Sequence, residues 1–457
     1  MLSLTIGEIT KVLGASLLQG DPARRVTAVT TDSRKVVSGT LFFALKGERY
    51  DGHSFVGEAV AGGAAGAVVS RPVPVPPEAV LLVVPDVLTA LGDLARHVRQ
   101  QAGVFVLGVT GSTGKTTVKD MIAAVLGVRY RVLATRGNLN NEVGLPLTLL
   151  ELGLEHQVAV VEMAMRRPGE ITALARVASP NAAVITNVGE THLERLGSVR
   201  AIAAAKGEIL DFVPPEGFAV LHAESPFILE EAKRCRGRLI FFGTGDKATV
   251  RLVGYRPAGG AVSFRVVAGG REEEYSLPVP GQHNAVNALA AVAVAREMGL
   301  GPGEIREGLQ RVRLSGMRLE IKDCGPLTVI NDAYNANPAS MRAALAVLEE
   351  VAQGRRRVAV LGDMLELGER AAEAHREVGE AAVNRADLIV TVGKLAEGIA
   401  AGAGFASGRV VSCPDAAAAV AVLRKILRGN EVVLVKASRG MHLETVVDAL
   451  CAGGERG

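Results

Sequence analysis

The feature that most constrains this chain is a glycine-rich turn between an apolar run and a helical pattern. The turn reads Gly-Ser-Thr-Gly-Lys-Thr-Thr over residues 111–117. Val104–Val109 before it is typical of a buried parallel strand, and residues 118–126 after it place apolar side chains at helical spacing. Glycines let backbone N–H groups converge on phosphate oxygens, and the start of a helix adds positive potential. The pattern therefore predicts a loop that binds ATP or GTP.

The spacing within the turn differs from the strict Walker A pattern, because Val109 stands where that pattern has its first glycine. We expect Lys115 to reach the terminal phosphates and Thr116 to bind Mg²⁺. The alternative is a glycine turn with a solvated lysine. Strand, turn and helix all agree with the phosphate-loop interpretation, so we favour it.

Length and composition indicate a globular protein of several domains. The 457 residues fit about three domains of ~150 residues each. The net charge is only +3, so nothing indicates a nucleic-acid-binding surface. No apolar run approaches the ~18 residues of a membrane-spanning helix, and the N-terminus lacks the features of a signal peptide. Because Cys235, Cys324, Cys413 and Cys451 lack metal or redox spacing, we expect buried or reduced thiols in a cytoplasmic protein.

Alternating strand and helix patterns predict an α/β protein of three domains. We expect a small α/β domain over residues 1–101, a doubly wound domain around the phosphate loop over 102–313, and a Rossmann-like domain over 314–457. The expected central strands are Val104–Val109, Gln157–Met163, Ala182–Thr186, Gly217–Leu221 and Arg238–Phe242. The expected C-terminal strands are Leu327–Ile330, Arg357–Leu361, Leu388–Val392, Arg409–Ser412 and Glu431–Val435. We also expect an antiparallel extension over 249–277 and helices over 199–210 and 283–298. No Gly-x-Gly-x-x-Gly follows these strands, which disfavours a dinucleotide cofactor.

Three candidates for metal or phosphate chemistry follow the central strands. Glu162 ends a strand, where a carboxylate can bind Mg²⁺ or position water; a helix-capping acid is an equally good interpretation. His192 follows the next strand, either as a ligand or as a hydrogen-bonded structural group. Lys206 lies in a mainly apolar helical pattern, where burial would make its amine neutral and able to take up CO₂ as a carbamate. A plain salt bridge is the simpler alternative for Lys206.

Amides and charged groups at other strand ends and helix starts are candidate nucleotide or substrate contacts. Asn284 and Asn287 begin a predicted helix three positions apart and can either read a nucleobase edge or cap the helix. Asp332 and Asn335 follow a strand without an evident capping role, so they are candidates for contacting a ribose or another substrate. Lys436 ends the last predicted strand, where it can face the same cleft.

The N-terminal region contains a further candidate site for an anionic ligand. Ser33, Arg34 and Lys46 lie in two polar and basic segments at the ends of apolar runs. Loops of this kind bind anions in many proteins, and solvated turns are the alternative.

Together these segments resemble the Mur ligase family of bacterial cell-wall synthesis over essentially the whole chain. The phosphate loop, Glu162, His192, Lys206 and the Gly-Gln-His-Asn segment at 281–284 are similar to the family pattern. Three longer segments resemble the member type that adds D-alanyl-D-alanine, and they cover residues 137–146, 331–338 and 361–368. One departure is Ala164, where many relatives have glycine.

The resemblance implies that the first domain binds a UDP-sugar, the second binds ATP, and the third closes over both with the incoming amine. The implied ATP-binding residues are Gly111, Ser112, Thr113, Gly114, Lys115, Thr116, Thr117, Asn284 for adenine, Arg318 for phosphate and Asp332 for ribose. It also implies two Mg²⁺ ions, one on Thr116 and Glu162 and one on His192 and a carbamylated Lys206. Lys115, His192 and Lys206 are then the catalytic candidates. The substrate candidates are Ser33, Arg34 and Lys46 for the UDP-sugar, with Asn335 and Lys436 in the cleft.

The implied reaction is the ATP-dependent formation of an amide. A carboxylate is a poor electrophile toward an amine at neutral pH, so γ-phosphoryl transfer must first convert it to an acyl phosphate. The amine of D-alanyl-D-alanine then attacks the activated carboxyl group of UDP-N-acetylmuramoyl-tripeptide, and the tetrahedral intermediate collapses to amide and phosphate. Both reactants are anionic, so the site must neutralise charge, and domain closure must exclude water.

Other protein classes fit the residues less well. A nucleotide switch or motor subunit would share the phosphate loop but would not need Lys206 or a second α/β domain, and a small-molecule kinase would stop at phosphate transfer. A nearer alternative is another Mur-type ligase, which adds the third residue or glutamate chains to folate; the asparagine-rich segment 331–338 argues against it. The third peptide residue, diaminopimelate or lysine, stays open. We expect a cytoplasmic monomer with no nucleic-acid or membrane partner.

Overall fold

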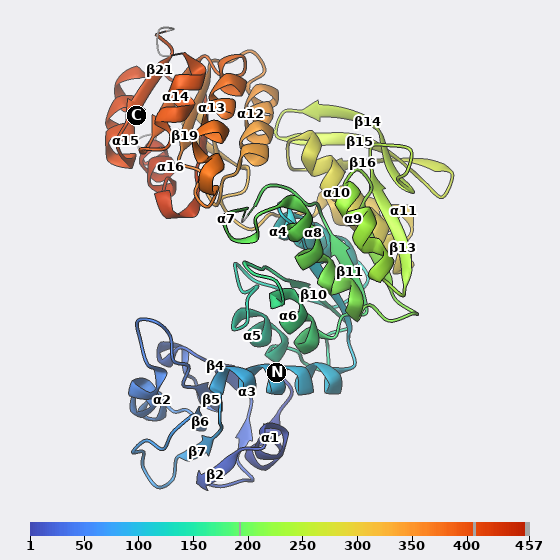
Figure 1. The fold of residues 1–457 in the computed structure, drawn as a ribbon, viewed down its shortest axis with the longest axis vertical. Helices are drawn as coiled ribbons and strands as arrows, with labels where there is room; N and C mark the ends of the chain where they lie inside the picture. The colour runs from blue at the N-terminus through green and yellow to red at the C-terminus, as the bar shows by residue number, and fades with distance from the viewer. Residues whose placement is uncertain (192, 405–407, 453–457) are drawn as a thin grey trace.

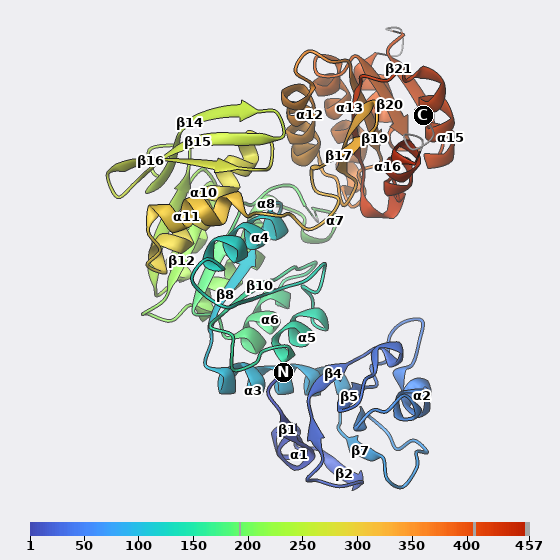
Figure 2. The same cartoon turned by 180° about the vertical axis from the view of Figure 1, so that it is seen from behind.

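The described residues form three large β-sheets that follow one another along an elongated molecule (Figures 1 and 2). The structure is a computed structural model that describes residues 1–191, 193–404 and 408–452. The N-terminal sheet lies at one end, the central sheet in the middle and the C-terminal sheet at the other end. Helices cover each sheet, so the predicted α/β class is confirmed.

The N-terminal sheet has five strands. Their order is β2 (Ser16–Gln19), β7 (Val80–Val83), β6 (Gly66–Val69), β5 (Thr40–Phe43) and β4 (Ala28–Thr30). The short strands β1 (Leu4–Thr5) and β3 (Arg25–Val26) form a separate pair next to α1 (Ile6–Leu13), and α2 (Val56–Ala61) follows β5. The long helix α3 (Val87–Ala102) packs against α1 and also against helices of the central part, so it joins the first two parts of the molecule.

The central sheet has nine strands and contains the phosphate loop. Their order is β16 (Arg271–Leu277), β15 (Ala261–Ala268), β14 (Val250–Ala258), β13 (Arg238–Gly243), β12 (Phe218–His222), β11 (Ala182–Ile185), β8 (Phe105–Thr110), β10 (Val158–Glu162) and β9 (Val132–Ala134). Strands β8 to β13 are parallel, whereas β14, β15 and β16 form the predicted antiparallel extension. The parallel order places the ends of β8, β10 and β11 side by side, which is where a doubly wound sheet binds ligands.

Helices cover both faces of the central sheet. One face packs against α4 (Lys115–Leu126), α10 (Gln282–Glu297) and α11 (Pro302–Gln310). The other face packs against α5 (Gly144–Leu150), α6 (Glu170–Ala178) and α8 (Val199–Gly207). Two short helices, α7 (Leu193–Leu196) and α9 (Pro226–Glu231), complete this part. The helix expected over 199–210 is shorter than predicted, because α8 ends at Gly207 and a 3₁₀ turn continues from Glu208 to Phe212.

The C-terminal sheet has six strands, of which only the first is antiparallel. Their order is β17 (Glu320–Cys324), β18 (Leu327–Asp332), β22 (Val432–Lys436), β19 (Arg357–Gly362), β20 (Leu388–Val392) and β21 (Val410–Cys413). Helices α12 (Pro338–Ala352), α13 (Ala371–Val383) and α14 (Glu397–Ala403) cover one face, and α15 (Ala416–Ile426) and α16 (Glu444–Cys451) cover the other. The predicted strands of both large sheets are confirmed to within one or two residues. Within the described ranges, no helix has the length and apolar character needed to cross a bilayer.

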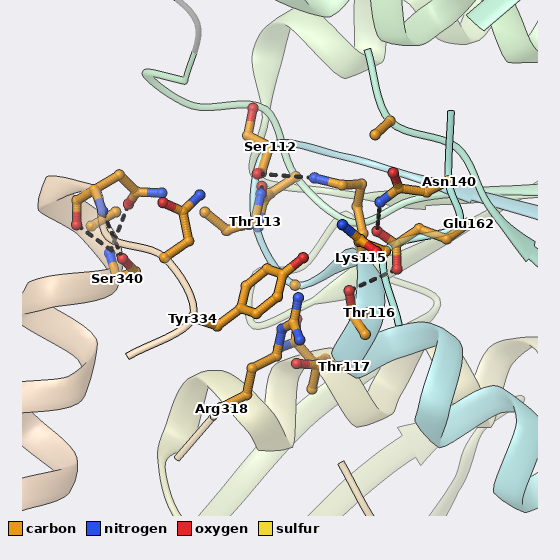
Figure 3. Close-up of a pocket in the computed structure, with 18 of the residues that line it drawn as sticks. Ser112, Thr113, Lys115, Thr116, Thr117, Asn140, Glu162, Arg318, Tyr334 and Ser340 are labelled. Carbon is orange, nitrogen blue, oxygen red and sulfur yellow. Dashed lines mark hydrogen bonds between the residues drawn. The ribbon is translucent and has the colours of Figure 1, made fainter. Parts of the chain in front are cut away.

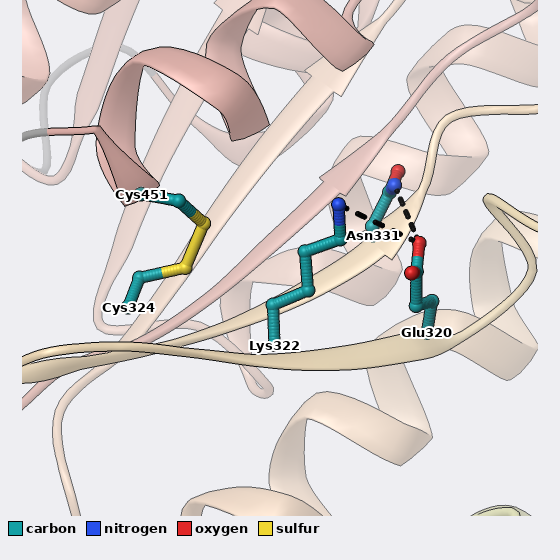
Figure 4. The surroundings of a disulfide bond; sticks show 5 residues. All are labelled: Glu320, Lys322, Cys324, Asn331 and Cys451. Atoms are coloured by element: carbon teal, nitrogen blue, oxygen red, sulfur yellow. Dashed lines mark hydrogen bonds and ion pairs between the residues drawn. A yellow bond between two sulfur atoms is a disulfide. The ribbon is translucent and has the colours of Figure 1, made fainter.

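The expectation that all four cysteines are thiols, either buried or reduced, is wrong for two of them. Cys324, at the end of β17, and Cys451, at the end of α16, form a disulfide with their Cα atoms 4.4 Å apart (Figure 4). The two residues are 127 positions apart in the sequence, so their spacing does not indicate a pair. They meet because α16 packs against β17. Cys235 and Cys413 are free thiols.

Candidate active site

The turn between β8 and α4 has the backbone that a phosphate loop requires. Gly111 has φ 149°, and a Cβ atom at this position would lie 1.9 Å from Thr186 Oγ1. Gly114, with φ 75°, is the N-cap of α4. Asn187, just after β11, fixes the loop: its Oδ1 accepts the Thr113 N–H at 2.9 Å, and its Nδ2 donates to Thr113 Oγ1 at 2.7 Å. The free N–H groups at the start of α4 therefore face the end of the sheet.

Lys115 is the first residue of α4 and folds back over the loop (Figure 3). Its Nζ donates to the Gly111 carbonyl at 2.9 Å. Burial lowers the pKa of Lys115, the Glu162 carboxylate opposes this effect, and the Arg318 guanidinium adds to it. A phosphate in the loop would give this ammonium group an anionic partner instead of a neutral carbonyl.

Thr116 and Glu162 form a donor pair that suits Mg²⁺. Thr116 Oγ1 donates to Glu162 Oε2 at 2.7 Å, and Asn140 Nδ2 donates to Glu162 Oε1 at 2.7 Å (Figure 3). Only 2% of Glu162 is exposed. Mg²⁺ is typically bound by one or two protein oxygens together with phosphate oxygens and water, so a hydroxyl and a buried carboxylate beside a phosphate loop fit this ion. Among the described residues, no three His, Cys, Asp or Glu side chains gather as a metal cluster.

Asn140 and Asn187 are two site residues to which the sequence alone assigned no role. Asn140 lies in the 137–146 segment that resembles the D-alanyl-D-alanine-adding type, and the run of asparagines there is the signal that could have identified it. Asn187 directly follows a predicted strand, which is the usual position for a residue that contacts a neighbouring loop.

Lys206 is buried in α8, with 1% of its surface exposed. Burial places the pKa of Lys206 well below its ordinary value, and the nearby charge of Lys115 lowers it further. Burial and the charge of Lys115 are the effects found on this amine, and no carboxylate among the described residues pairs with it, so the salt-bridge alternative has no partner there. His192 lies outside the described residues.

A cavity of about 730 Å³ is lined by both the central and the C-terminal parts of the chain. The predicted site residues that line it are Ser112, Thr113, Gly114, Lys115, Thr116, Thr117, Glu162, Asn284, Asn287, Arg318, Asp332, Asn335 and Lys436. Gly111 and Lys206 are not among the lining residues. Segments more than 200 positions apart therefore meet around one space, as a shared cleft requires.

Several cavity residues have partners within the protein. Asn284 Nδ2 donates to the Pro280 carbonyl at 2.7 Å, so one of its donors stabilises the start of α10. Asp332 accepts from Lys436 Nζ at 2.6 Å, and Lys436 also donates to the Asn335 carbonyl at 2.8 Å. The Asp332–Lys436 ion pair therefore fixes the ends of β18 and β22 at the edge of the cavity.

The candidates of the N-terminal part do not reach this cavity. Ser33 and Arg34 lie in a 3₁₀ turn, and the 81%-exposed Arg34 side chain bonds to both carboxylate oxygens of Asp32 at 2.9 Å. This guanidinium lowers the pKa of Asp32 to about 2. Lys46 forms an isolated backbone bridge with Asp51.

Comparison with known proteins agrees with this architecture along the whole chain. Three family models match: "Mur ligase family, catalytic domain" at residues 25–99, "Mur ligase middle domain" at 109–295 and "Mur ligase, glutamate ligase domain" at 317–439. A UDP-N-acetylmuramoyl-tripeptide–D-alanyl-D-alanine ligase of Bacillus subtilis is 41% identical, and the match covers 98% of this chain and 99% of the relative.

Solved structures agree with the sequence matches. A crystal structure of MurF from Acinetobacter baumannii is 34% identical with a TM-score of 0.90, covering 98% of this chain and 99% of that one. The MurF ligase of Thermotoga maritima in complex with ADP is 28% identical with a TM-score of 0.83, covering 94% of this chain and 98% of that one. Because the three family models together match most of the sequence, and a relative 41% identical matches nearly all of it, the chain belongs to the Mur ligase family.

Proposed function

We propose that this chain is an ATP-dependent ligase that joins D-alanyl-D-alanine to UDP-N-acetylmuramoyl-tripeptide. The observation that carries the proposal is the shared cavity, in which Lys115 and the Thr116–Glu162 pair face Arg318 and Lys436 of the C-terminal part. A nucleotide switch would not need these C-terminal cations. The near full-length match to a ligase of this name supports the substrate assignment.

The residues of the cavity fit the formation of an acyl phosphate followed by attack of an amine. The loop N–H groups and Lys115 bind the phosphates and neutralise their charge as the substrate carboxylate approaches. When bound to Thr116 and Glu162, Mg²⁺ would supply further charge neutralisation at the transferred phosphoryl group. Arg318, Asp332, Asn335 and Lys436 come from the C-terminal part and act on the nucleotide and on the incoming dipeptide. Enclosure between the two parts protects the acyl phosphate from water.

We also propose that Lys206 is carbamylated and that, with His192, it provides oxygen and nitrogen ligands for a second Mg²⁺. The burial of Lys206, its lowered pKa and the lack of a described partner for its amine support a neutral amine. A neutral amine is the form that reacts with CO₂.

The remaining assignments concern the roles of the three domains, the oligomeric state and the cellular location. We assign residues 1–101 to the UDP-sugar, with Ser33, Arg34 and Lys46 as contacts, residues 102–313 to ATP and residues 314–457 to domain closure. We also propose that the protein acts as a monomer. We place the reaction in the cytoplasm, where ATP and UDP-linked sugars are available.

A coupled assay of ADP release tests the proposed function. The enzyme with ATP, Mg²⁺ and UDP-N-acetylmuramoyl-tripeptide should release ADP at a sustained rate only when D-alanyl-D-alanine is added. The Lys115→Ala variant is the negative control. Equal ADP release without D-alanyl-D-alanine would indicate a kinase or ATPase, and turnover of UDP-N-acetylmuramoyl-dipeptide with a single amino acid would indicate another Mur-type ligase.

A further inference from the structure

Arg318 enters the cavity without a hydrogen bond or an ion pair to any described residue. It does contact an aromatic ring: the guanidinium carbon lies 3.7 Å from the centroid of the Tyr334 ring. Asp332 is near enough for the charge of Arg318 to affect its pKa, but its carboxylate is already paired with Lys436. Figure 3 shows Arg318 and Tyr334 pointing toward the phosphate loop, and Thr113 and Thr117 of that loop line the same cavity. The N–H groups of Arg318 are thus available to an anion in the cavity.

The backbone that presents Arg318 is held in an unusual conformation. The residues on both sides of it, Met317 and Leu319, have φ of 60° and 50°, in the left-handed region that costs about 1–3 kcal/mol for such residues. Two hydrogen bonds keep them there: Leu319 N–H donates to Asp332 Oδ1, and Tyr334 N–H donates to the Met317 carbonyl, each at 3.2 Å. Tyr334 therefore contacts the Arg318 segment through both its ring and its backbone.

The charges in the cavity explain why an aromatic ring next to Arg318 is useful. Lys115 and Arg318 are two cations that repel each other, and the charge of Arg318 lowers the pKa of Lys115. The phosphates of a bound nucleotide would screen this repulsion. A long arginine side chain is free to turn away from such repulsion. The negative face of an aromatic ring attracts a guanidinium group without neutralising its charge, so it can hold the group in place and leave its N–H groups unused.

We propose that Tyr334 is a positioning residue whose ring holds the Arg318 guanidinium in the cleft, ready for the terminal phosphates of the nucleotide. This inference rests on the proposed function, because it takes the anion to be the phosphate chain of ATP. The ring performs this task, and the phenolic hydroxyl is not needed for it. Tyr334 lies within the asparagine-rich segment 331–338, between the site candidates Asp332 and Asn335.

The test measures nucleotide affinity by titration calorimetry with a non-hydrolysable ATP analogue and, separately, with ADP, both with Mg²⁺. Tyr334→Leu should weaken binding of the analogue by about two- to thirtyfold, which is the range expected for a cation–π contact, and should weaken binding of ADP less. Tyr334→Phe keeps the ring and should stay within about twofold of the wild type. Phe227→Leu, which removes the ring beside Arg200 at 6.0 Å, is the matched control outside the cavity and should bind both nucleotides normally.

A double-mutant cycle separates positioning from a general structural effect. In an Arg318→Ala background, Tyr334→Leu should cause no further loss, because the residue that the ring holds is gone. If Tyr334→Leu does not fold, 3,5-difluorophenylalanine at position 334 serves instead: it keeps the shape of Phe but weakens the negative face of the ring, and it should weaken analogue binding relative to Phe.

Three results would overturn the inference. They are a loss in Tyr334→Phe as large as in Tyr334→Leu, an undiminished effect of Tyr334→Leu in the Arg318→Ala background, and unchanged analogue binding in Tyr334→Leu. Failure of the proposed function looks different, because it would show in the assay of ADP release as turnover that does not depend on D-alanyl-D-alanine, whereas these titrations measure nucleotide binding alone.

Discussion

At the scale of single residues, Lys206 shows how burial changes the chemistry of an ordinary side chain. An ammonium group without a described partner is costly to bury, so the amine favours its neutral form. If a carbamate forms on it, Lys206→Ala should lower the ligation rate by at least about a hundredfold, since it removes a group that stabilises charge in the reaction. Added formate or acetate should restore part of the rate by replacing the missing carboxylate-like group. Failure of both acids to restore activity in a folded variant would favour a structural role.

His283, at the start of α10, should make the stability of the central part depend on pH. Burial lowers the pKa of His283 to about 4, and the charge of Lys436 contributes. In the unfolded chain an ordinary histidine titrates near pH ~6.5, so below that pH the unfolded state takes up a proton that the folded state excludes. The stabilising contribution is therefore present above about pH 6.5 and is lost as the pH falls toward 4. His283→Gln should unfold at a midpoint that changes less than that of the wild type between about pH 7 and about pH 4.5. Parallel profiles for the two proteins would contradict this.

Residues of the phosphate loop can be recognised from the sequence because they are close together in it. Lys115 and Thr116 are consecutive, and Glu162 is found at the end of a strongly apolar strand. Asn140, Asn187 and Tyr334 are different, because each acts on a partner from another segment, as Asn187 does on Thr113 at a separation of 74 residues. The disulfide between Cys324 and Cys451 is equally hard to predict, because its two residues are 127 positions apart in the sequence.

At the scale of elements, the buried parallel strands are the most predictable parts of the chain. Central strands such as β8, β10 and β11 are continuous apolar runs, so the sequence identifies them to within a residue or two. The end of α8 is harder to predict. Glu208, the first residue of the turn that follows α8, accepts hydrogen bonds from the start of helix α6. The N-cap of helix α6 is Gly169, which has no side chain to accept a hydrogen bond, and Glu208 supplies the missing acceptors.

Glu208 should therefore stabilise α6 across a sequence distance that no local capping rule covers. Its carboxylate accepts the Gly169 N–H at 2.7 Å, the Thr172 N–H at 2.9 Å and the Thr172 hydroxyl at 3.0 Å. Glu208→Ala should lower the free energy of unfolding by about 1–2 kcal/mol, as for the loss of a strong cap, and Glu208→Gln by less. Urea titration measures the difference. Glu216→Ala, at an exposed position before β12, is the matched control and should change stability by less than about 0.5 kcal/mol.

At the scale of the whole molecule, the order of the three sheets is predictable, but the way in which the C-terminal part docks is not. Docking depends on a few contacts between surfaces that are polar in the sequence. Tyr255, in β14, donates to Glu350 of α12 at 2.7 Å. Arg370, just before α13, donates to Glu190 at 2.6 Å. Neither pair has a spacing or composition that would identify it before folding.

The Arg370–Glu190 pair links the C-terminal part to the phosphate loop. Glu190 follows Gly189, whose N–H donates to Ser112 Oγ in the loop at 3.0 Å. The two side chains are 39% and 40% exposed, so the pair should contribute only about 0.2–1 kcal/mol to the docked arrangement. That energy corresponds to a change of up to about fivefold in the docked population. Arg370→Glu and Glu190→Arg should each lower kcat within this range.

Exchanging the charges of Arg370 and Glu190 tests whether this ion pair holds the C-terminal part against the central part. The double variant, Arg370→Glu together with Glu190→Arg, should recover part of the wild-type kcat, because the attraction is restored with opposite polarity while the new carboxylate at position 370 still faces Glu373 and Glu377. The same exchange at Arg376 and Glu380, an exposed pair within α13, is the control and should leave kcat unchanged in all variants. At about 1 M salt, where charges are screened beyond ~3 Å, the single variants should approach the wild type. Single variants that lose activity equally at low and high salt, and a double variant that recovers none, would show that the pair does not hold the domains together by its charge.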